Sequence, residues 1–331
     1  MELNAILNLL ADGEFHSGAE LGDALGVSRT AVWKHLQKLE PLGLALTSVK
    51  GKGYCLPGGL ELLDRERILG AVDASARSLV SELDLRTIAD STNTRAQARA
   101  AAGEARGYLC LAEQQTAGRG RRGRDWVSPF GKNIYLSAVW GFDGGVAALE
   151  GLSLAVGVAL VAALERCGLS GASLKWPNDL LWQERKLAGI LLEMSGDVDG
   201  YCQVVVGIGL NVAMPEKAAE AIDQAWVDVQ AMAAAQGVAP VSRNALVAAI
   251  LSELLPLLAS FQSRTFTRWQ ERWEALDAYR DCPVALSTAS SSVAGIARGV
   301  SETGALKVEV DGVLQQFHGG EISVRREGGG V

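Results

Sequence analysis

The stretch Gly118–Trp126 has the highest density of residues able to do chemistry in this chain. It reads Gly-Arg-Gly-Arg-Arg-Gly-Arg-Asp-Trp, so three glycines alternate with four arginines. Glycine lets the backbone approach a ligand closely, and each guanidinium is a planar, charged fork suited to phosphate or carboxylate. Because such closely spaced cations repel one another unless an anion joins them, the pattern predicts an anion-binding loop. A solvated basic linker and a nucleic-acid patch are the alternatives.

A second polar motif, Ser91-Thr92-Asn93, follows a strand-like segment and precedes an alanine-rich run that ends near Ala102. Hydroxyl and amide groups at a helix N-terminus suit an anion or the polar head of a ligand. Simple helix capping is the alternative, and it needs only one of the three residues.

Two more motifs lie further along the chain. Lys175-Trp-Pro-Asn-Asp179 takes a strand into a turn and back into a strand, and Lys186-Leu-Ala-Gly-Ile-Leu-Leu-Glu193 forms the next strand. Taken separately, a Pro-Asn-Asp turn is a common hairpin device, and a lysine at the start of a strand is usually a solvated edge residue.

The elements that must position these motifs alternate between strand and helix from Leu83 to Ile322. Apolar periodicity predicts strands over residues 85–88, 108–115, 133–140, 186–193 and 204–212. It predicts a buried helix over residues 151–167, a loop and then a helix within 214–235, and amphipathic helices over 242–261 and 265–276. From Asp281 onward five short strands and an Asp311-Gly312 hairpin turn predict a small SH3-type barrel, and we expect the Gly328–Gly330 tail to be disordered.

Residues 1–57 have the pattern of a helix-turn-helix. Ser17 with Glu20 forms a capping box, Gly26 is placed for a tight turn, and Ser28 caps the next helix. A hairpin with a basic tip follows as a wing. The residues suited to phosphates and base edges are Ser28, Arg29, Thr30, Lys34, Lys50 and Lys52. A three-helix protein-interaction module is the alternative.

Composition limits the remaining possibilities. The net charge is −7 over 331 residues, so any DNA binding must rest on a local surface. The five cysteines are widely spaced without a CxxC pair, which indicates neither a disulfide framework nor a zinc site. No segment has the pattern of a secretory signal or a membrane span, so we expect a cytoplasmic protein without a membrane partner.

In their order and spacing, the four motifs closely resemble the biotin protein ligases. With the helix-turn-helix in front, nearly the whole chain resembles the bifunctional biotin ligase and biotin operon repressor of bacteria. The resemblance implies an α+β fold in three parts. These are a winged helix-turn-helix (1–57), a mixed-sheet ligase domain of the class II synthetase/biotin–lipoate ligase type (58–278), and an SH3-like β-barrel (279–326).

The resemblance also implies an activity. The family uses ATP to form biotinyl-5′-AMP and transfers biotin to a lysine of the biotin carboxyl carrier protein of acetyl-CoA carboxylase. When this acceptor is used up, the bound adenylate acts as co-repressor, and a homodimer binds operator DNA. The expected cofactors are ATP, biotin and Mg²⁺, with the metal held by phosphates and water rather than by dedicated side chains.

By match to the family, the catalytic residues would be Lys186, Arg121 and Asp179, with Asp179 near the metal and the acceptor lysine. Biotin would be bound by Ser91, Thr92, Asn93, Gln115, Arg119, Gly120, Arg121 and Lys186. ATP or the adenylate would be bound by Arg119, Arg121, Arg124, Trp126, Lys186, Asn211 and Trp226.

Two other functions remain open from the residues. A lipoate ligase shares the catalytic fold of this superfamily, although the Arg/Gly loop and Lys-Trp-Pro-Asn-Asp favour biotin. A ligand-sensing repressor without catalysis is the second, but a pure sensor needs no lysine and arginines placed for phosphoryl transfer.

Overall fold

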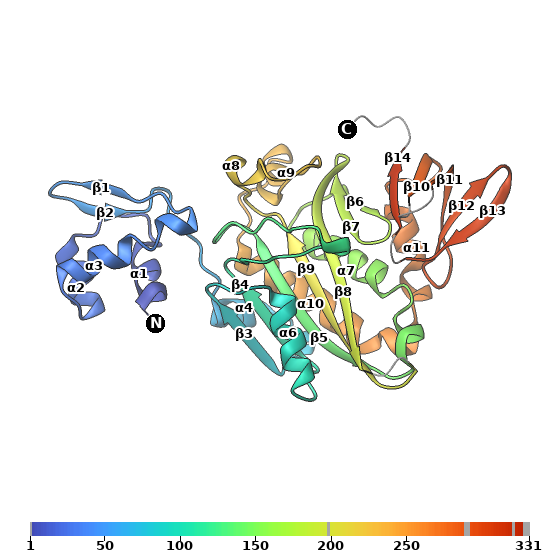
Figure 1. Cartoon of the computed structure of the whole chain (residues 1–331), viewed down its shortest axis with the longest axis horizontal. Coiled ribbons are helices and arrows are strands. Elements are labelled where there is room, and N and C mark those ends of the chain that lie inside the picture. Colours follow the sequence, from blue (N-terminus) through green and yellow to red (C-terminus); the bar gives the residue numbers. More distant parts are fainter. Residues whose placement is uncertain (1, 197–198, 288–291, 320–321, 327–331) are drawn as a thin grey trace.

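The computed structural model describes residues 2–196, 199–287, 292–319 and 322–326, and its three parts follow one another along the chain (Figure 1). A winged helix and a five-stranded C-terminal sheet lie at opposite ends of a seven-stranded central sheet. The expected α+β class is confirmed. The glycine tail, Gly328–Gly330, lies outside the described residues.

The N-terminal part forms as its caps predict. Helices α1 (Glu2–Leu10), α2 (Gly18–Leu25) and α3 (Arg29–Leu36) precede a 3₁₀ turn, η1 (Glu40–Leu42), and the wing strands β1 (Thr47–Val49) and β2 (Gly53–Cys55). Ser17 and Glu20 make the expected capping box, and Gly26 ends α2 in the left-handed conformation at φ 65°. A small apolar core that includes Ile6, Leu21 and Val32 packs the three helices together.

The central sheet is mixed and has the order β3-β4-β5-β9-β8-β7-β6. Its strands are β3 (Glu82–Arg86), β4 (Tyr108–Ala112), β5 (Ile134–Phe142), β6 (Ala172–Lys175), β7 (Asp179–Trp182), β8 (Arg185–Gly196) and β9 (Cys202–Leu210). Only β3 and β4 run parallel, paired from Glu82–Tyr108 to Arg86–Ala112. They end together at Arg86 and Ala112, so β3 begins and ends earlier than expected and β4 stops short of Gln115.

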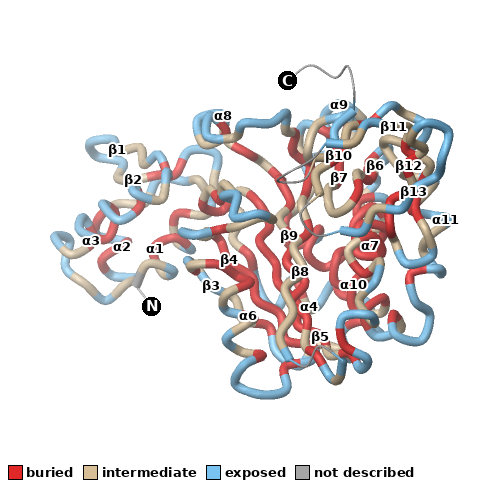
Figure 2. Tube along the Cα trace, turned by 45° about the vertical axis from the view of Figure 1, so that its right-hand side comes forward, coloured by how far each residue is buried: buried red, intermediate tan, exposed pale blue. Residues whose placement is uncertain are grey.

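Helices cover both faces of this sheet. The short helices α4 (Arg65–Ala71) and α5 (Ala74–Arg77), together with α7 (Leu152–Arg166) and α10 (Arg243–Arg264), pack on one face, and α6 (Thr92–Ala101) on the other. Beside them lie η3 (Gly145–Leu149), α8 (Glu216–Ala219), α9 (Val229–Ala235) and α11 (Thr267–Leu276). The buried residues follow the central strands and these helices, whereas the wing is largely exposed (Figure 2).

Two helical stretches of the described chain, Gly145–Arg166 and Arg243–Arg264, are long and apolar enough to cross a membrane by length and composition alone. The sequence analysis, which found no segment with the pattern of a membrane span, missed these two stretches. Their most apolar windows are 56% and 72% buried inside the fold, which accounts for the apolar composition.

The C-terminal part contains the five expected strands: β10 (Pro283–Ser287), β11 (Ser292–Val300), β12 (Leu306–Val310), β13 (Val313–Phe317) and β14 (Ser323–Arg326). They pair antiparallel in the order β13-β12-β11-β10-β14. The predicted turn joins β12 to β13, with Asp311 and Gly312 at φ 50° and 78°. Trp176 fastens this sheet to the central domain, because its indole N–H donates to the Gly304 carbonyl at 3.0 Å.

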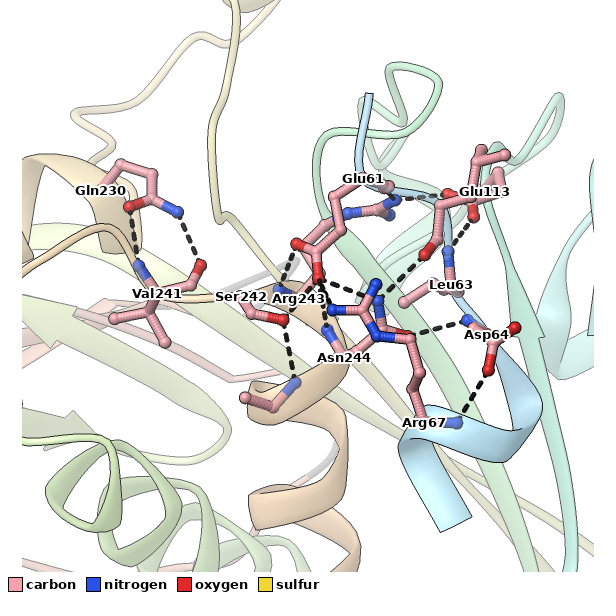
Figure 3. A network of polar contacts seen from close by, with 12 residues as sticks. Glu61, Leu63, Asp64, Arg67, Glu113, Gln230, Val241, Ser242, Arg243 and Asn244 are labelled. Atoms are coloured by element: carbon pink, nitrogen blue, oxygen red, sulfur yellow. Dashed lines mark hydrogen bonds and ion pairs between the residues drawn. The ribbon is translucent and has the colours of Figure 1, made fainter. Parts of the chain in front are cut away.

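The linker between the winged helix and the central domain is held by a buried polar network (Figure 3). Glu113 and Arg243 form an ion pair at 2.7 Å with each side chain about 5% exposed or less. The Leu63 N–H donates to Glu113, and the Asp64 N–H donates to Asn244. Unpairing such a buried charge is expensive, so the network fixes where the linker enters the domain.

Asp277, at the end of α11, gives a prediction on pH and stability. Burial raises the pKa of its carboxyl to about 6 from 3.8, and within the described residues its buried Oδ2 has no hydrogen-bond partner. The folded state therefore binds the proton more tightly than the unfolded state, and stability falls as the pH rises from about 4 to 6. At pH 7 we expect Asp277→Asn to be more stable by about 3 kcal/mol.

The measurement is the free energy of urea unfolding at pH 4, 5, 6 and 7. The difference in unfolding free energy between Asp277→Asn and the wild type should grow over this range. For Asp223→Asn, a change at an exposed aspartate, the difference should stay near zero. A gap of the same size at every pH would contradict the assignment.

Candidate active site

At the centre of the candidate site, three glycines of the central sheet leave a patch of bare backbone. We call this patch, Gly189, Gly207 and Gly209, the glycine floor. Gly189 of β8 pairs with Gly209 of β9, and Gly207 lies two residues further along β9 on the same face. A Cβ atom would lie 2.2 Å from Asn93 Oδ1 if placed on Gly207, and 2.4 Å from the Trp126 ring if placed on Gly209. Only glycine therefore lets Asn93 and Trp126 come this close to the sheet.

A cluster of uncharged polar side chains surrounds Asn93 on this floor. Gln115 Oε1 accepts hydrogen bonds from the Thr92 N–H at 2.9 Å and the Thr92 hydroxyl at 3.1 Å. The Ser137 hydroxyl lies 2.8 Å from Thr92 Oγ1 and 2.6 Å from Asn93 Oδ1. Ser91 is buried beside them at the N-cap of α6, without a side-chain capping bond. The motif and Gln115 thus come together although they are far apart in the sequence.

The Arg/Gly loop folds back on itself beside this cluster. The Gly120 N–H donates to the Arg124 carbonyl at 2.7 Å, and the Trp126 N–H donates to the Gly118 carbonyl at 2.9 Å. A Cβ on Gly118 would lie 2.8 Å from the Trp126 carbonyl, so this glycine permits the closure. At the tip, the 3₁₀ turn η2 (Arg121–Gly123) exposes Arg122 and Arg124.

Two arginines of the loop point to different partners. Arg119 pairs with Glu193 of β8 at 3.1 Å and also donates to Thr94. Arg121 Nη1 donates to Asn178 Oδ1 at 3.0 Å, in the turn between β6 and β7, and Nη2 donates to the Ile322 carbonyl at 3.4 Å. Arg121 therefore joins the loop, the Pro-Asn-Asp turn and the C-terminal part.

Lys186 and Asp179 form an ion pair at 2.9 Å, and both are largely buried, with 17% and 16% of their side chains exposed. Lys186 Nζ also lies 5.5 Å from the centre of the Trp126 ring, and a Cβ on Gly189 would lie 3.4 Å from Lys186 Cε. The same glycine floor thus brings the ion pair next to Trp126.

Lys175 lies directly opposite Asp179 in the β6–β7 hairpin. Burial lowers the pKa of its ammonium group, with Asp179 opposing the shift and the charges of Lys186, Arg325 and Arg124 adding to it. Cations outnumber anions here, and such a surplus is stabilised by an anionic ligand.

The segment before α9 is held against Lys186 through backbone bonds. The Lys186 N–H donates to the Ala225 carbonyl and the Val227 N–H donates to the Lys186 carbonyl, so Trp226 lies beside Lys186 in a short parallel bridge. Asn211 Nδ2 donates to the Val227 carbonyl at 3.2 Å. In this structure the Asn211 amide therefore anchors the segment that carries Trp226.

The structure also places at the site residues to which the sequence analysis assigned no role. Glu193, Asn178, Lys175 and Gly189 belong to its motifs, whereas Ser137, Gly207 and Gly209 lie outside them. Gly207 and Gly209 could have been found from the sequence, because alternating glycines inside an apolar strand indicate that another group approaches the strand closely. Glu193 and Ser137 are single polar residues in strands. Their roles follow only from contacts with residues that are distant in the sequence.

The DNA-binding candidates lie together on the winged helix. Ser28 caps α3, with its hydroxyl 3.3 Å from the Ala31 N–H, and Arg29, Thr30 and Lys34 are exposed along that helix. Lys50 and Lys52 are exposed at the tip of the wing. This is the arrangement in which a recognition helix and a wing approach DNA.

Fold and site together define a class, an acid-activating ligase domain carrying a DNA-binding domain. Family models agree along the chain: HTH domain over residues 2–55, Biotin/lipoate A/B protein ligase family over residues 85–211, and Biotin protein ligase C terminal domain over residues 283–325.

Relatives narrow this class. The Bifunctional ligase/repressor BirA of Escherichia coli (strain K12) is 41% identical over 97% of this chain and 96% of its own length. The Biotin--[acetyl-CoA-carboxylase] ligase of Paracoccus denitrificans is 36% identical over 66% of this chain and 90% of its own length. The chain thus belongs to the bifunctional ligase/repressor family of biotin protein ligases. A solved Aquifex aeolicus biotin protein ligase in complex with biotin and ATP matches 75% of this chain and 100% of its own, with a TM-score of 0.62 and 27% identity.

Proposed function

We propose that this chain uses ATP to convert biotin to biotinyl-5′-AMP and then transfers the biotinyl group to a lysine of an acceptor protein. The observation that carries the proposal is the surplus of cations beside the glycine floor, with an uncharged polar cluster next to it. The cluster suits a polar ring system without net charge, and the cations suit a carboxylate and a phosphate brought together.

In the first step a carboxylate oxygen of biotin attacks the α-phosphorus, the bond to the leaving oxygen breaks, and pyrophosphate departs. Two anions must approach each other, so catalysis needs positioning and charge stabilisation more than proton transfer. We assign Lys186 and Arg121 to this stabilisation. Gly120 closes the loop, and Arg124, Trp126, Asn211 and Trp226 line the nucleotide side.

In the second step the acceptor amine attacks the acyl carbon and AMP leaves. The amine loses a proton, and we assign Asp179 to accept it. We propose the biotin carboxyl carrier protein of acetyl-CoA carboxylase as the acceptor, because the Paracoccus relative is named as the ligase for that carboxylase.

We propose Mg²⁺ as the companion of ATP. Throughout the described ranges, the His, Cys, Asp and Glu side chains form no group of three suited to a metal ion. In this proposal, phosphates and water hold most of the coordination positions of the metal.

The test is exchange of labelled pyrophosphate into ATP, measured with biotin and with lipoate. Exchange that requires biotin supports the proposal. Exchange with lipoate instead would favour a lipoate-type ligase, and binding of biotin without exchange would favour a sensor without catalysis.

We further propose that the chain represses a biotin operon as a dimer, with biotinyl-5′-AMP as co-repressor and residues 1–57, 58–278 and 279–326 as its functional units. One contact supports a link between ligand and DNA. Phe130, just after the Arg/Gly loop, is 1% exposed and packs into the apolar core of the winged helix with Leu56 and Leu60. The loop that would close on the adenylate is thus continuous with that core.

The wing gives a prediction on DNA affinity. Each lysine that neutralises a phosphate adds about one unit to the slope of log affinity against log salt. We expect Lys50→Ala together with Lys52→Ala to lower that slope by about 2 while biotin-dependent exchange is unchanged. The measurement is fluorescence anisotropy on a duplex that this chain selects from a random pool, with biotin and ATP present.

The control for this measurement is Arg268→Ala, which removes an exposed cation from α11, away from the winged helix. An unchanged slope in the double variant, or the same loss in the control, would remove the wing from the DNA interface.

A further inference from the structure

Glu193 on β8 belongs to neither the Arg/Gly loop nor the polar motif of α6, yet it binds both. Its carboxylate accepts Arg119 Nη2 at 3.1 Å on each oxygen and Arg119 Nε at 3.3 Å. The same carboxylate accepts Asn93 Nδ2 at 2.6 Å. One side chain therefore connects the loop to the start of α6 across the glycine floor.

Arg119 uses most of its guanidinium on protein acceptors. Besides Glu193, its Nη1 donates to Thr94 Oγ1 at 2.6 Å and its Nη2 to Gln97 Oε1 at 3.2 Å. A guanidinium held in this way has little left to offer a phosphate. Arg119 thus differs from Arg121, which lies two residues further along and reaches Asn178 instead.

The contact with Asn93 also fixes the orientation of an amide. Because Nδ2 donates to Glu193, Oδ1 faces the Ser137 hydroxyl. Gly207 beneath this amide has no room for a side chain, so Asn93 is held by Glu193 of β8 and by Ser137 of β5, which pairs with Gly207. The carboxylate therefore sets the shape of the polar cluster as well as the position of the loop.

We propose that Glu193 is a positioning residue that latches the Arg/Gly loop, through Arg119, over the bound biotin and adenylate. It takes no part in phosphoryl transfer. The inference rests on the proposed ligase function, because its readouts are the affinity for biotin and the retention of the adenylate.

The first variant is Glu193→Gln. The glutamine oxygen can still accept the Asn93 amide, so the change mainly weakens the charge-assisted contact with Arg119. We expect KM for biotin to rise about tenfold and the bound adenylate to escape about tenfold faster. At saturating biotin, kcat of pyrophosphate exchange should stay within about twofold, because Lys186 and Arg121 are untouched.

The matched control is Glu165→Gln. It breaks a surface pair with Arg272 in which both side chains are about half exposed, and it should leave KM, kcat and adenylate retention unchanged.

A second variant, Arg119→Lys, lies in a loop and keeps the charge but loses the fork. If Glu193 acts through Arg119, this variant should repeat the rise in KM. The double variant, Glu193→Gln with Arg119→Lys, should then have a KM for biotin no higher than that of the single variant with the higher KM. Arg119→Lys keeps the test valid if Glu193→Gln should fail to fold.

The outcomes separate the two claims. A wild-type protein without biotin-dependent exchange would refute the proposed function itself. With an active wild type, normal KM and normal retention in both single variants, strictly additive effects, or a loss confined to kcat would each refute the latch alone.

Discussion

Lys186→Ala is expected to reduce biotin-dependent pyrophosphate exchange by about a thousandfold, because it removes a fixed charge from a largely buried site where two anions must meet. Lys186 and Asp179 are each less than a fifth exposed, so water replaces the lost charge poorly. The fold should survive, since the backbone of Lys186 remains bonded to Ala225 and Val227. The measurements are exchange at saturating biotin and ATP, and thermal unfolding.

Two companion variants sharpen this prediction. Lys186→Met keeps the aliphatic stem and should lose as much activity as the alanine variant, which isolates the charge from the packing. Lys38→Ala removes an exposed lysine of the winged helix and should leave exchange unchanged. Near-normal exchange in either Lys186 variant would reject the assigned role.

The sequence predicted the elements better than the contacts between them. Caps and hydrophobic periodicity placed α2, α3 and α7 closely, because these signals act within a few residues. The hairpin of Lys175 and Asp179 was also foreseen, since its turn is local. The ends of β3 and β4 were missed, because they depend on pairing between two strands that a helix separates in the chain, and no local signal reports such a pairing.

The same limit applies to the site. Glu193 binds Asn93 across 100 residues, and Ser137 binds the same side chain across 44 residues. No spacing rule connects positions so far apart within a sheet. The spacing of the loop also could not show that Arg119 and Arg121 have different partners. Arg119 meets Glu193 of β8, whereas Arg121 meets Asn178 in the β6–β7 turn.

Arg121→Gly is expected to slow formation of the adenylate, because it removes one of the two cations assigned to that step, and to let the adenylate that does form escape. The change removes the hydrogen bonds to Asn178 and to the Ile322 carbonyl and makes the loop more flexible. Two charge-assisted bonds of this kind are worth roughly 3 kcal/mol, so the residence time of the adenylate should fall about a hundredfold. The measurement is release of labelled biotinyl-5′-AMP from preloaded protein without acceptor.

Arg122→Gly is a closely matched control for this prediction. It lies in the same loop, removes the same charge and introduces the same residue, but its side chain is exposed and its backbone already has φ 60°, which glycine adopts without strain. If general loosening of the loop or loss of net positive charge were the cause, both variants would leak alike. Leakage confined to Arg121→Gly would trace retention to the contacts that join the loop, the Pro-Asn-Asp turn and the C-terminal sheet. Equal retention in Arg121→Gly and wild type would contradict that assignment.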